Sequence, residues 1–189
     1  MIFTGKKDLR KFFLQKRADI PMHVLKENSS QLCKNLISLK DFELADTILF
    51  FYPTKNEPEL FEAMFYALES KKSIAFPISR PDDTSLDFRL VGSLSELKMG
   101  TYKIPEPSGS LPVPTITENS LCIAPALAFD KNGFRLGYGK GYYDKFLSSF
   151  KGKSIGLVMD GFLCDSLPID SNDIPVDILI TQTGVVKQK

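Results

Sequence analysis

The fold class can be worked out from Thr47-Ile48-Leu49-Phe50-Phe51-Tyr52, an almost wholly apolar run that ends at a proline. A run of this kind is typical of a strand that is buried on both faces, as in a parallel sheet. Residues 57–68 then show helical spacing of apolar side chains, and Glu57-Pro58-Glu59 favours the first turn of that helix. A second apolar strand follows at residues 73–77. The three segments predict one strand–helix–strand crossover of an α/β sheet.

The rest of the chain extends this pattern in both directions. Helical periodicity predicts two helices before the first strand, over residues 4–17 and 21–37. Alternation of apolar and charged residues predicts an edge strand at 86–91, and the Pro- and Gly-rich segment 98–114 predicts a long ordered loop. The remaining expectations are a buried strand at 121–129, a helix at 141–150, and strands at 154–158 and 176–180.

Length and composition limit the class of protein. The 189 residues suit one domain, residues 1–189, and 43% hydrophobic with 25% charged residues is ordinary globular composition. The formal net charge of +1 argues against a nucleic-acid partner, and no apolar run reaches the roughly 18 residues of a membrane span. Charged residues also stand where a signal peptide would be apolar. We therefore expect a cytoplasmic monomer with no membrane or nucleic-acid partner.

Cysteine and histidine content argues against two classes of site. Cys33, Cys122 and Cys164 lie far apart without metal-ligand spacing, so we expect reduced, buried thiols and neither a disulfide framework nor a zinc site. The single histidine, His23, stands near a helix start and is expected on the surface. Histidine-centred nucleophilic catalysis and multi-histidine metal sites are thereby disfavoured.

One segment carries the features of a phosphate site. Residues 135–144 read Arg-Leu-Gly-Tyr-Gly-Lys-Gly-Tyr-Tyr-Asp, between a predicted strand and a predicted helix. Exposed backbone N–H groups, Arg135 and Lys140 favour an anion there, and Asp144 is an oxygen ligand of the kind that Mg²⁺ requires beside phosphates. The spacing is neither Walker A nor G-x-G-x-x-G. A tight turn that requires positive φ is the alternative explanation of the glycines, and core packing is the alternative for Tyr142-Tyr143.

This segment, preceded by Phe129-Asp130 and Gly133, resembles the signature of the 5-formyltetrahydrofolate cyclo-ligase family, also called methenyltetrahydrofolate synthetases. One departure is Ala126, where the family usually has Gly. The resemblance extends over most of the chain, in family order, through Lys6-x-x-x-Arg10, Glu57, Ile104-Pro105-Glu106-Pro107 and Asn172-Asp173-Ile174-Pro175-Val176-Asp177.

The resemblance implies a fold and a reaction. The fold would be a three-layer α/β/α sandwich with a mostly parallel sheet, similar to ribose-phosphate isomerase and CoA transferase folds. The enzyme would use ATP and Mg²⁺ to convert 5-formyltetrahydrofolate into 5,10-methenyltetrahydrofolate, with release of ADP and phosphate. The reaction would pass through a phosphorylated formyl (imidate) intermediate.

The resemblance also implies roles for individual residues. Arg135 and Lys140 would be catalytic through charge neutralisation, and Asp144 and Asp173 would bind Mg²⁺. Contacts to the folate would come from Tyr52, Glu57, Tyr102 and Tyr142. Contacts to ATP would come from Lys6, Lys7, Asp8, Leu9, Arg10, Arg135, Leu136, Gly137, Tyr138, Gly139, Lys140, Gly141, Tyr142 and Tyr143.

Other interpretations of the same residues stay open. The basic first helix could be a solvated face, Asp173 a turn residue, and Glu57 a helix N-terminal acid that complements the dipole. A sugar-phosphate isomerase on the same fold would need neither nucleotide nor Mg²⁺. A nucleic-acid binder that stacks bases on Tyr142-Tyr143 would show affinity that falls steeply with salt, and the near-zero net charge argues against it.

Overall fold

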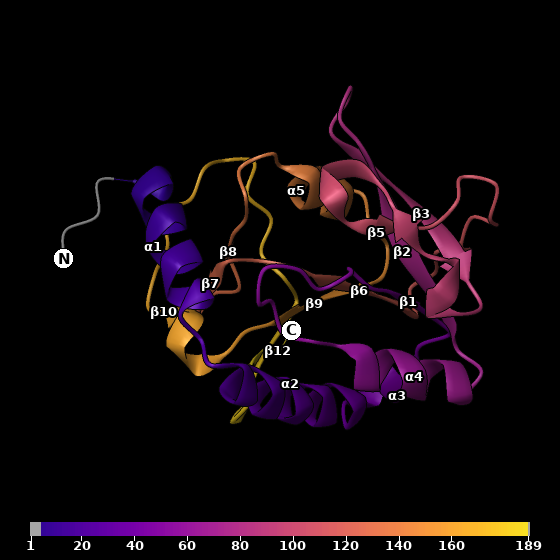
Figure 1. Ribbon diagram of the computed structural model, residues 1–189, viewed down its shortest axis with the longest axis horizontal. Helices are drawn as coiled ribbons and strands as arrows, with labels where there is room; N and C mark the ends of the chain where they lie inside the picture. The colour runs from indigo at the N-terminus through magenta and orange to yellow at the C-terminus, as the bar shows by residue number, and fades with distance from the viewer. Residues whose placement is uncertain (1–4, 189) are drawn as a thin grey trace.

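The structure of the protein is a computed structural model that describes residues 5–188. Its main feature is a seven-stranded sheet with the strand order β12-β11-β9-β6-β1-β2-β3 (Figure 1). The two edge strands, β3 (Ser85–Val91) and β12 (Gly184–Gln188), run antiparallel to their neighbours. The inner strands are parallel to one another: β1 (Thr47–Leu49), β2 (Ser73–Arg80), β6 (Ser120–Ala124), β9 (Lys153–Leu157) and β11 (Ile178–Thr181). The expected α/β fold with a mostly parallel sheet is confirmed.

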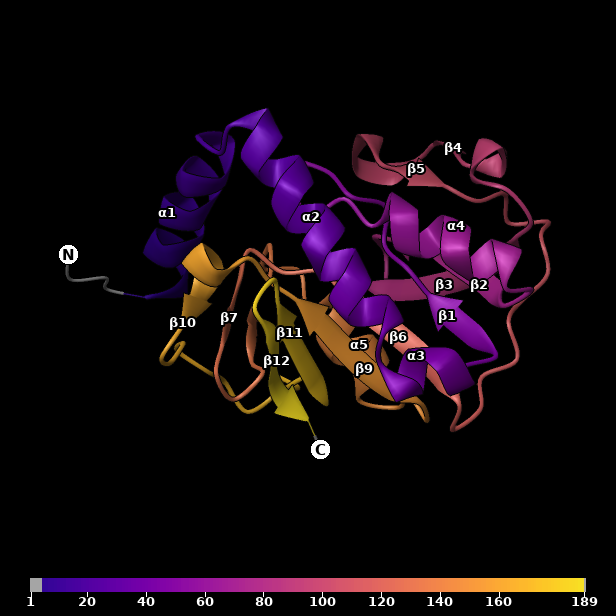
Figure 2. The ribbon, with the colours of Figure 1, turned by 90° about the horizontal axis from the view of Figure 1, so that it is seen from below.

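Helices cover both faces of this sheet. On one face lie α2 (Met22–Ile37), α3 (Lys40–Leu44) and α4 (Phe61–Glu69), which stand in front of the strands in Figure 2. On the other side lie α1 (Lys6–Ala18) and the short α5 (Tyr142–Leu147) (Figure 1). The core between these layers contains fully buried side chains such as Phe50 and Phe76, whose rings stack with centroids 6.2 Å apart.

A smaller sheet lies beside α1 in both views, in the order β10-β7-β8 (Figures 1 and 2). Its strands are β7 (Ala128–Asp130), β8 (Arg135–Leu136) and β10 (Leu163–Cys164). The prediction of one continuous strand over 121–129 is therefore wrong. Pro125 has no N–H to donate to a neighbouring strand, and the chain leaves the central sheet there before it pairs again as β7.

Short elements complete the fold. Within the segment expected to be a long loop, β4 (Lys98–Met99) and β5 (Pro105–Glu106) form a small hairpin around a 3₁₀ turn. The 3₁₀ turns are η1 (Leu94–Glu96), η2 (Thr101–Lys103) and η3 (Asp160–Phe162). The rest of segment 98–114 has no regular secondary structure. Contacts with the body of the protein hold it, since Leu111 packs on the core and the Pro112 carbonyl accepts a hydrogen bond from the Leu90 N–H.

Several predicted boundaries differ from the structure. The helix expected from Glu57 begins only at Phe61, and Glu57 is buried instead of forming an exposed first turn. The helix expected over 141–150 ends at Leu147, whereas the second helix matches its prediction and the first runs over Lys6–Ala18. The expected start of the first helix at residue 4 lies outside the described residues. The short elements α3 and β12 were not predicted.

The predictions for individual side chains fare better. Cys33 and Cys122 are free, buried thiols, Cys164 is free and half-buried, and His23 is exposed. Burial raises the pKa of the Cys33 thiol to about 11, which keeps it protonated at neutral pH. Within the described part of the chain, no helix is long and apolar enough to cross a membrane.

Gly156 offers a test of the packing between the two sheets. A Cβ at this position in β9 would lie 2.6 Å from the buried Phe129 ring and 3.0 Å from Leu179 Cδ1. We predict that Gly156→Ala lowers the free energy of unfolding by about 1–3 kcal/mol, because a rigid core has to move to admit the methyl group. The matched control is Gly109→Ala, whose Cβ would have only Ile78 Cδ1, at 4.0 Å, as a near neighbour. Urea unfolding would measure both variants, and equal stabilities would contradict the prediction.

Candidate active site

The site lies at the carboxyl ends of β1 and β6, where the direction of the chain across the sheet reverses. From β1 the chain passes through α4 to β2 on one side, whereas β6 pairs with the other side of β1 and leads through α5 to β9. The segments that follow β1 and β6 therefore diverge to opposite faces and leave a crevice between them. Open α/β sheets bind ligands in a crevice of this kind.

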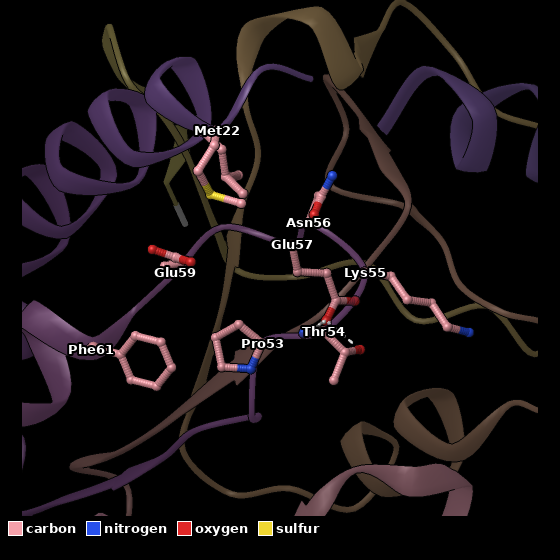
Figure 3. Close-up of a pocket in the computed structure, with 9 residues that line it drawn as sticks. Met22, Pro53, Thr54, Lys55, Asn56, Glu57, Glu59 and Phe61 are labelled. Carbon is pink, nitrogen blue, oxygen red and sulfur yellow. Dashed lines mark hydrogen bonds between the residues drawn. The ribbon is translucent and has the colours of Figure 1, made fainter. Parts of the chain in front are cut away.

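Glu57 is the buried carboxylate of this crevice, with only 4% of the residue exposed. Its Oε2 accepts hydrogen bonds from the Thr54 backbone N–H at 2.9 Å and the Thr54 hydroxyl at 3.3 Å (Figure 3). Its Oε1 accepts one from the Tyr138 hydroxyl at 3.1 Å and lies 3.6 Å from Nη1 of Arg17. The interpretation of Glu57 as a helix N-terminal acid is therefore wrong, since α4 begins only at Phe61 and the Glu57 carboxylate is bonded back to Thr54.

Burial of Glu57 has an electrostatic consequence. Removal from water raises the pKa of this carboxyl above its ordinary value, although the Thr54 N–H, the charge of Arg17 and the Tyr138 hydroxyl all oppose the shift. Burial thus favours the neutral acid, whereas the three partners favour the ionised carboxylate. Perturbed titratable groups in a crevice are typical of functional sites.

A cavity of about 200 Å³ opens beside Glu57 (Figure 3). It lies between the start of α2 and segment 53–61, and the side chains that line it are Met22, Leu25, Pro53, Thr54, Lys55, Asn56, Glu57, Glu59 and Phe61. Its volume is below the roughly 300–1,000 Å³ of a pocket for a whole drug-sized ligand. A ligand of that size could place only one end here.

The glycine-rich loop borders the same crevice. Gly139 and Gly141 adopt φ values of +97° and +76°, which side-chain-bearing residues rarely do, so the tight-turn explanation of these glycines is confirmed for both. The Gly137 carbonyl accepts a hydrogen bond of 2.9 Å from Arg10 Nε, which ties the loop to α1. A Cβ at Gly137 or Gly141 would have no heavy atom within 4 Å. The loop is thus bent, anchored and open on its outer side.

Two ion pairs join the cations predicted for phosphate to the carboxylates predicted for metal. The buried Arg135 guanidinium contacts Asp144 Oδ1 at 2.6 Å through Nη2 and the Ile174 carbonyl at 2.6 Å through Nη1. Lys6 Nζ lies 2.5 Å from Asp173 Oδ2 and 2.6 Å from Asp170 Oδ2.

The Asp173 carboxyl is stabilised in its ionised form. Burial opposes ionisation, but hydrogen bonds from Lys6 and the Asp170 N–H, with the charges of Lys6 and Arg135, hold its pKa below the ordinary value. The Asp173 carboxylate thus stands ionised beside the Lys6 cation, and Asp173 is more than a turn residue.

The residues fit a nucleotide with Mg²⁺ in their chemistry. Each aspartate keeps one carboxylate oxygen, Asp144 Oδ2 and Asp173 Oδ1, for which the structure gives no hydrogen bond. Mg²⁺ commonly uses one or two carboxylates together with water and phosphate oxygens. Among residues 5–188 no three His, Cys, Asp or Glu side chains gather into a metal-binding group.

The other predicted site residues differ in how far they are exposed to a ligand. Lys7, Asp8 and Lys140 are exposed, whereas Leu9 and Leu136 are buried in the core, so a ligand could meet only their backbone. Tyr52, predicted for the folate, is half-buried with its ring edge-on to Phe61 at 5.7 Å.

Tyr102 and Tyr142 meet from two segments that lie far apart in the sequence. Their hydroxyls lie 3.0 Å apart and their rings form an edge-on contact with centroids 6.3 Å apart. Burial and the hydrogen bond to Tyr102 raise the pKa of Tyr142 to about 12. The neighbouring Tyr143 carries a buried hydroxyl with no hydrogen-bond partner within the described chain.

Sequence reasoning missed Arg17. This side chain is almost wholly buried, donates from Nη2 to the Ala126 and Leu127 carbonyls, and approaches Glu57 with Nη1. A signal was present, because Leu9, Phe13 and Arg17 follow one another at intervals of four and therefore share one face of α1. An arginine in that position on an apolar face predicts a buried cation that needs a partner.

Comparison with known proteins gives consistent matches over nearly the whole chain. Residues 3–182 match the model of the 5-formyltetrahydrofolate cyclo-ligase family. Similar proteins include the 5-formyltetrahydrofolate cyclo-ligase of Mycolicibacterium smegmatis, which is 30% identical over an alignment covering 96% of each chain. The solved structure of the Aquifex aeolicus 5,10-methenyltetrahydrofolate synthetase has a TM-score of 0.80 and 31% identity, with 97% of this chain and 92% of that chain covered. The synthetase structure from Mycoplasma pneumoniae, at 23% identity, supports the fold with a TM-score of 0.74 over 94% of this chain and 98% of that chain.

The buried Glu57 carboxyl predicts a pH dependence of stability. Because its pKa is raised in the folded state above the ordinary 4.5, folding favours the protonated acid. That contribution is complete below pH 4.5 and is lost as the pH rises through the folded-state value. We predict that the free energy of unfolding of the wild type falls, relative to that of Glu57→Gln, as the pH increases over this range.

Urea unfolding of both proteins at a series of pH values would measure the difference, with the exposed Glu118→Gln as the control. If the wild type instead became more stable relative to Glu57→Gln as the pH rises, the effect of Arg17 and Tyr138 on the Glu57 pKa would outweigh the effect of burial.

Proposed function

This chain belongs to the 5-formyltetrahydrofolate cyclo-ligase family, and we propose that it converts 5-formyltetrahydrofolate into 5,10-methenyltetrahydrofolate. The observation that carries the proposal is the arrangement at the end of β1 and β6. There the glycine-rich loop, with Arg135 and Lys140, borders the same crevice as the buried Glu57 carboxylate. The crevice thus has a cationic, backbone-lined part suited to phosphates and a carboxylate part suited to a ring with N–H donors.

We propose further that the reaction consumes ATP in the presence of Mg²⁺. A formamide oxygen is a poor leaving group, so it first attacks the γ-phosphorus, the bond to ADP breaks, and a phosphorylated imidate forms. N10 of the folate then adds to the formyl carbon and gives up its proton to solvent, and the C–O bond breaks with release of inorganic phosphate. In such a sequence the protein mainly positions the groups and offsets charge.

On the phosphate side, Lys6, Arg10, Arg135 and Lys140 supply positive charge. Lys6 and Arg135 are paired with Asp173 and Asp144 in the structure, so binding exchanges these contacts. The cations would turn to phosphate oxygens, and the Asp144 and Asp173 carboxylates would hold Mg²⁺, which would supply positive charge that offsets the charge of the phosphates. In this exchange each cation gains a phosphate oxygen and each carboxylate gains Mg²⁺. No buried charge is left without a partner, which is the costly outcome when an ion pair is simply broken.

On the folate side, Glu57 accepts hydrogen bonds from the N–H groups along the edge of the pterin ring. Oε1 carries a single hydrogen bond, from Tyr138, so it retains acceptor capacity. Tyr52, Tyr102 and Tyr142 contribute aromatic surface around the same crevice, and the contact between Tyr102 and Tyr142 would be exchanged for contacts to the substrate.

A direct assay tests the proposed reaction. Purified protein would be mixed with 5-formyltetrahydrofolate, ATP and Mg²⁺, and the near-ultraviolet absorbance of the conjugated methenyl product would be followed. Parallel samples would omit ATP or contain a metal chelator. We expect product only in the complete mixture. Folded protein that forms no product, or forms it equally well without ATP, would contradict the proposal.

Lys140 gives the sharpest mutational test on the phosphate side. Arg135 is buried and paired, so its removal would disturb folding as well as binding, whereas Lys140 is exposed and has no ion pair within the described chain. We predict that Lys140→Ala lowers kcat/KM for ATP by about 10²–10³-fold, through loss of a charge that offsets the transferring phosphate. Steady-state kinetics would measure this against Lys151→Ala, an exposed lysine beyond α5. Equal kinetics in the two variants would remove Lys140 from the site.

Asp144 tests the metal assignment. In Asp144→Asn the Oδ1 acceptor for Arg135 and the Ile174 N–H is retained, but the negative charge is lost. We predict that the Mg²⁺ concentration for half-maximal activity rises about tenfold or more. The control is Asp165→Asn, an exposed carboxylate paired only with Lys131. An unaltered Mg²⁺ titration of Asp144→Asn would exclude Asp144 as a metal ligand.

A further inference from the structure

Arg17 occupies the point where the segments after β1 and β6 come together. Only 2% of the residue is exposed. Its Nη2 donates to the carbonyls of Ala126 at 2.6 Å and Leu127 at 3.1 Å, both in the segment after β6. Its Nη1 lies 3.6 Å from Oε1 of Glu57, in the segment after β1. One guanidinium therefore spans the crevice and joins its two sides.

The hydrogen bonds of this guanidinium are incomplete. Nε and Nη1 are buried and have no hydrogen-bond partner within the described chain. A buried cation with unpaired donors is costly, and the charge of Glu57 is its main electrostatic compensation. The separation of 3.6 Å from Oε1 is longer than a hydrogen bond, so the pair attracts by charge while Oε1 keeps acceptor capacity for another donor.

The backbone of Arg17 supports the same segment. Its carbonyl accepts a hydrogen bond of 3.1 Å from Asn56 Nδ2. Lys55 and Asn56 have φ values of +50° and +56°, a conformation that costs free energy in residues other than glycine. Such a conformation persists only where the surroundings hold it. Arg17 thus holds the turn before Glu57 with its backbone and the carboxylate itself with its side chain.

We propose that Arg17 is a positioning residue that sets the affinity for the folate substrate by fixing the Glu57 carboxylate at the carboxyl end of β1. The inference rests on the proposed function, which gives Glu57 the contact to the substrate. Arg17 itself acts through Glu57 and does not touch the reacting atoms.

The effect should fall mainly on the folate. The Tyr138 side chain of the glycine-rich loop interacts with both Glu57 and Arg17, but the phosphate side also has anchors of its own. The glycine-rich loop is anchored to α1 by Arg10 through the Gly137 carbonyl, and Lys6 is held by Asp170 and Asp173. None of these contacts uses the Arg17 side chain. Loss of its guanidinium should therefore change binding of the folate much more than binding of ATP.

Three variants test this selectivity. Arg17→Met removes the charge and the fork of donors, Arg17→Lys keeps the charge alone, and Lys16→Met is the matched control on the same helix. Lys16 donates to the Gly161 carbonyl and lies over the Phe12 and Phe162 rings, away from Glu57. Circular dichroism melting would establish that each variant folds, and Arg17→Lys keeps the test decisive if Arg17→Met does not fold.

Two measurements would be made on each variant. Isothermal titration calorimetry gives Kd for 5-formyltetrahydrofolate without turnover, and steady-state kinetics gives KM for both substrates. We expect Arg17→Met to raise Kd and KM for the folate by about 10- to 100-fold, because a misplaced contact group costs binding on that scale. Arg17→Lys should fall between this variant and the wild type, and KM for ATP should stay within about twofold in all of them. Equal changes in both KM values, or none, would overturn the inference.

A double-mutant cycle decides whether Arg17 acts through Glu57. In a Glu57→Gln background there is no carboxylate charge to hold, so Arg17→Met should change the folate Kd much less than it does in the wild type. The same fold-change in both backgrounds would overturn the inference. A wild type that binds the folate but forms no methenyl product would refute the proposed function alone, and one that does not bind it would refute both.

Discussion

Parallel pairing of β1 with both β2 and β6 is the constraint on which the rest of the structure depends. Parallel neighbours need crossovers, and the crossovers on the two sides of β1 run over opposite faces of the sheet, through α4 on one face and α5 on the other. The segments after β1 and β6 are therefore forced apart. Every group proposed here to act on a ligand stands beside the crevice that this divergence creates or is connected to it through α1.

Charge at this crevice is local and balanced. The chain has a net charge of +1, yet it buries the guanidiniums of Arg17 and Arg135, each opposite one carboxylate. Burying such charges is costly, so pairs of this kind are a weak source of stability. Their value lies in position, because each pairing keeps a cation in place beside the crevice before a ligand binds. The pairs thus favour a site prepared for anionic and hydrogen-bonding groups.

Helices and strands whose buried residues recur at a regular interval could be predicted from the sequence. Turns, whose buried residues follow no regular interval, could not. The parallel strands and the helix Met22–Ile37 follow from apolar periodicity, since each buries a continuous face. The position of Glu57 does not, because the preceding turn uses positive φ at Lys55 as well as at Asn56, and lysine, unlike asparagine, does not mark such a turn. In the candidate site, the glycine-rich loop could be found from its spacing. The contacts of Arg17 with residues more than 100 positions away could not.

Backbone strain is found in turns and not in the strands of the central sheet. Among the described residues, six that are not glycine have positive φ, and four of them form two pairs: Lys55 with Asn56, which line the cavity beside Glu57, and Tyr102 with Lys103, next to Tyr142. Each pair has a contact from outside its own segment: the Arg17 carbonyl accepts a hydrogen bond from Asn56, and the Tyr142 hydroxyl lies 3.0 Å from that of Tyr102. Within the second segment, the buried Glu106 carboxylate accepts a hydrogen bond from the Thr101 N–H. Strain that is stored next to a site and supported by distant residues keeps loops in conformations that they would not adopt alone. Part of the free energy of folding therefore offsets the cost of these turn conformations.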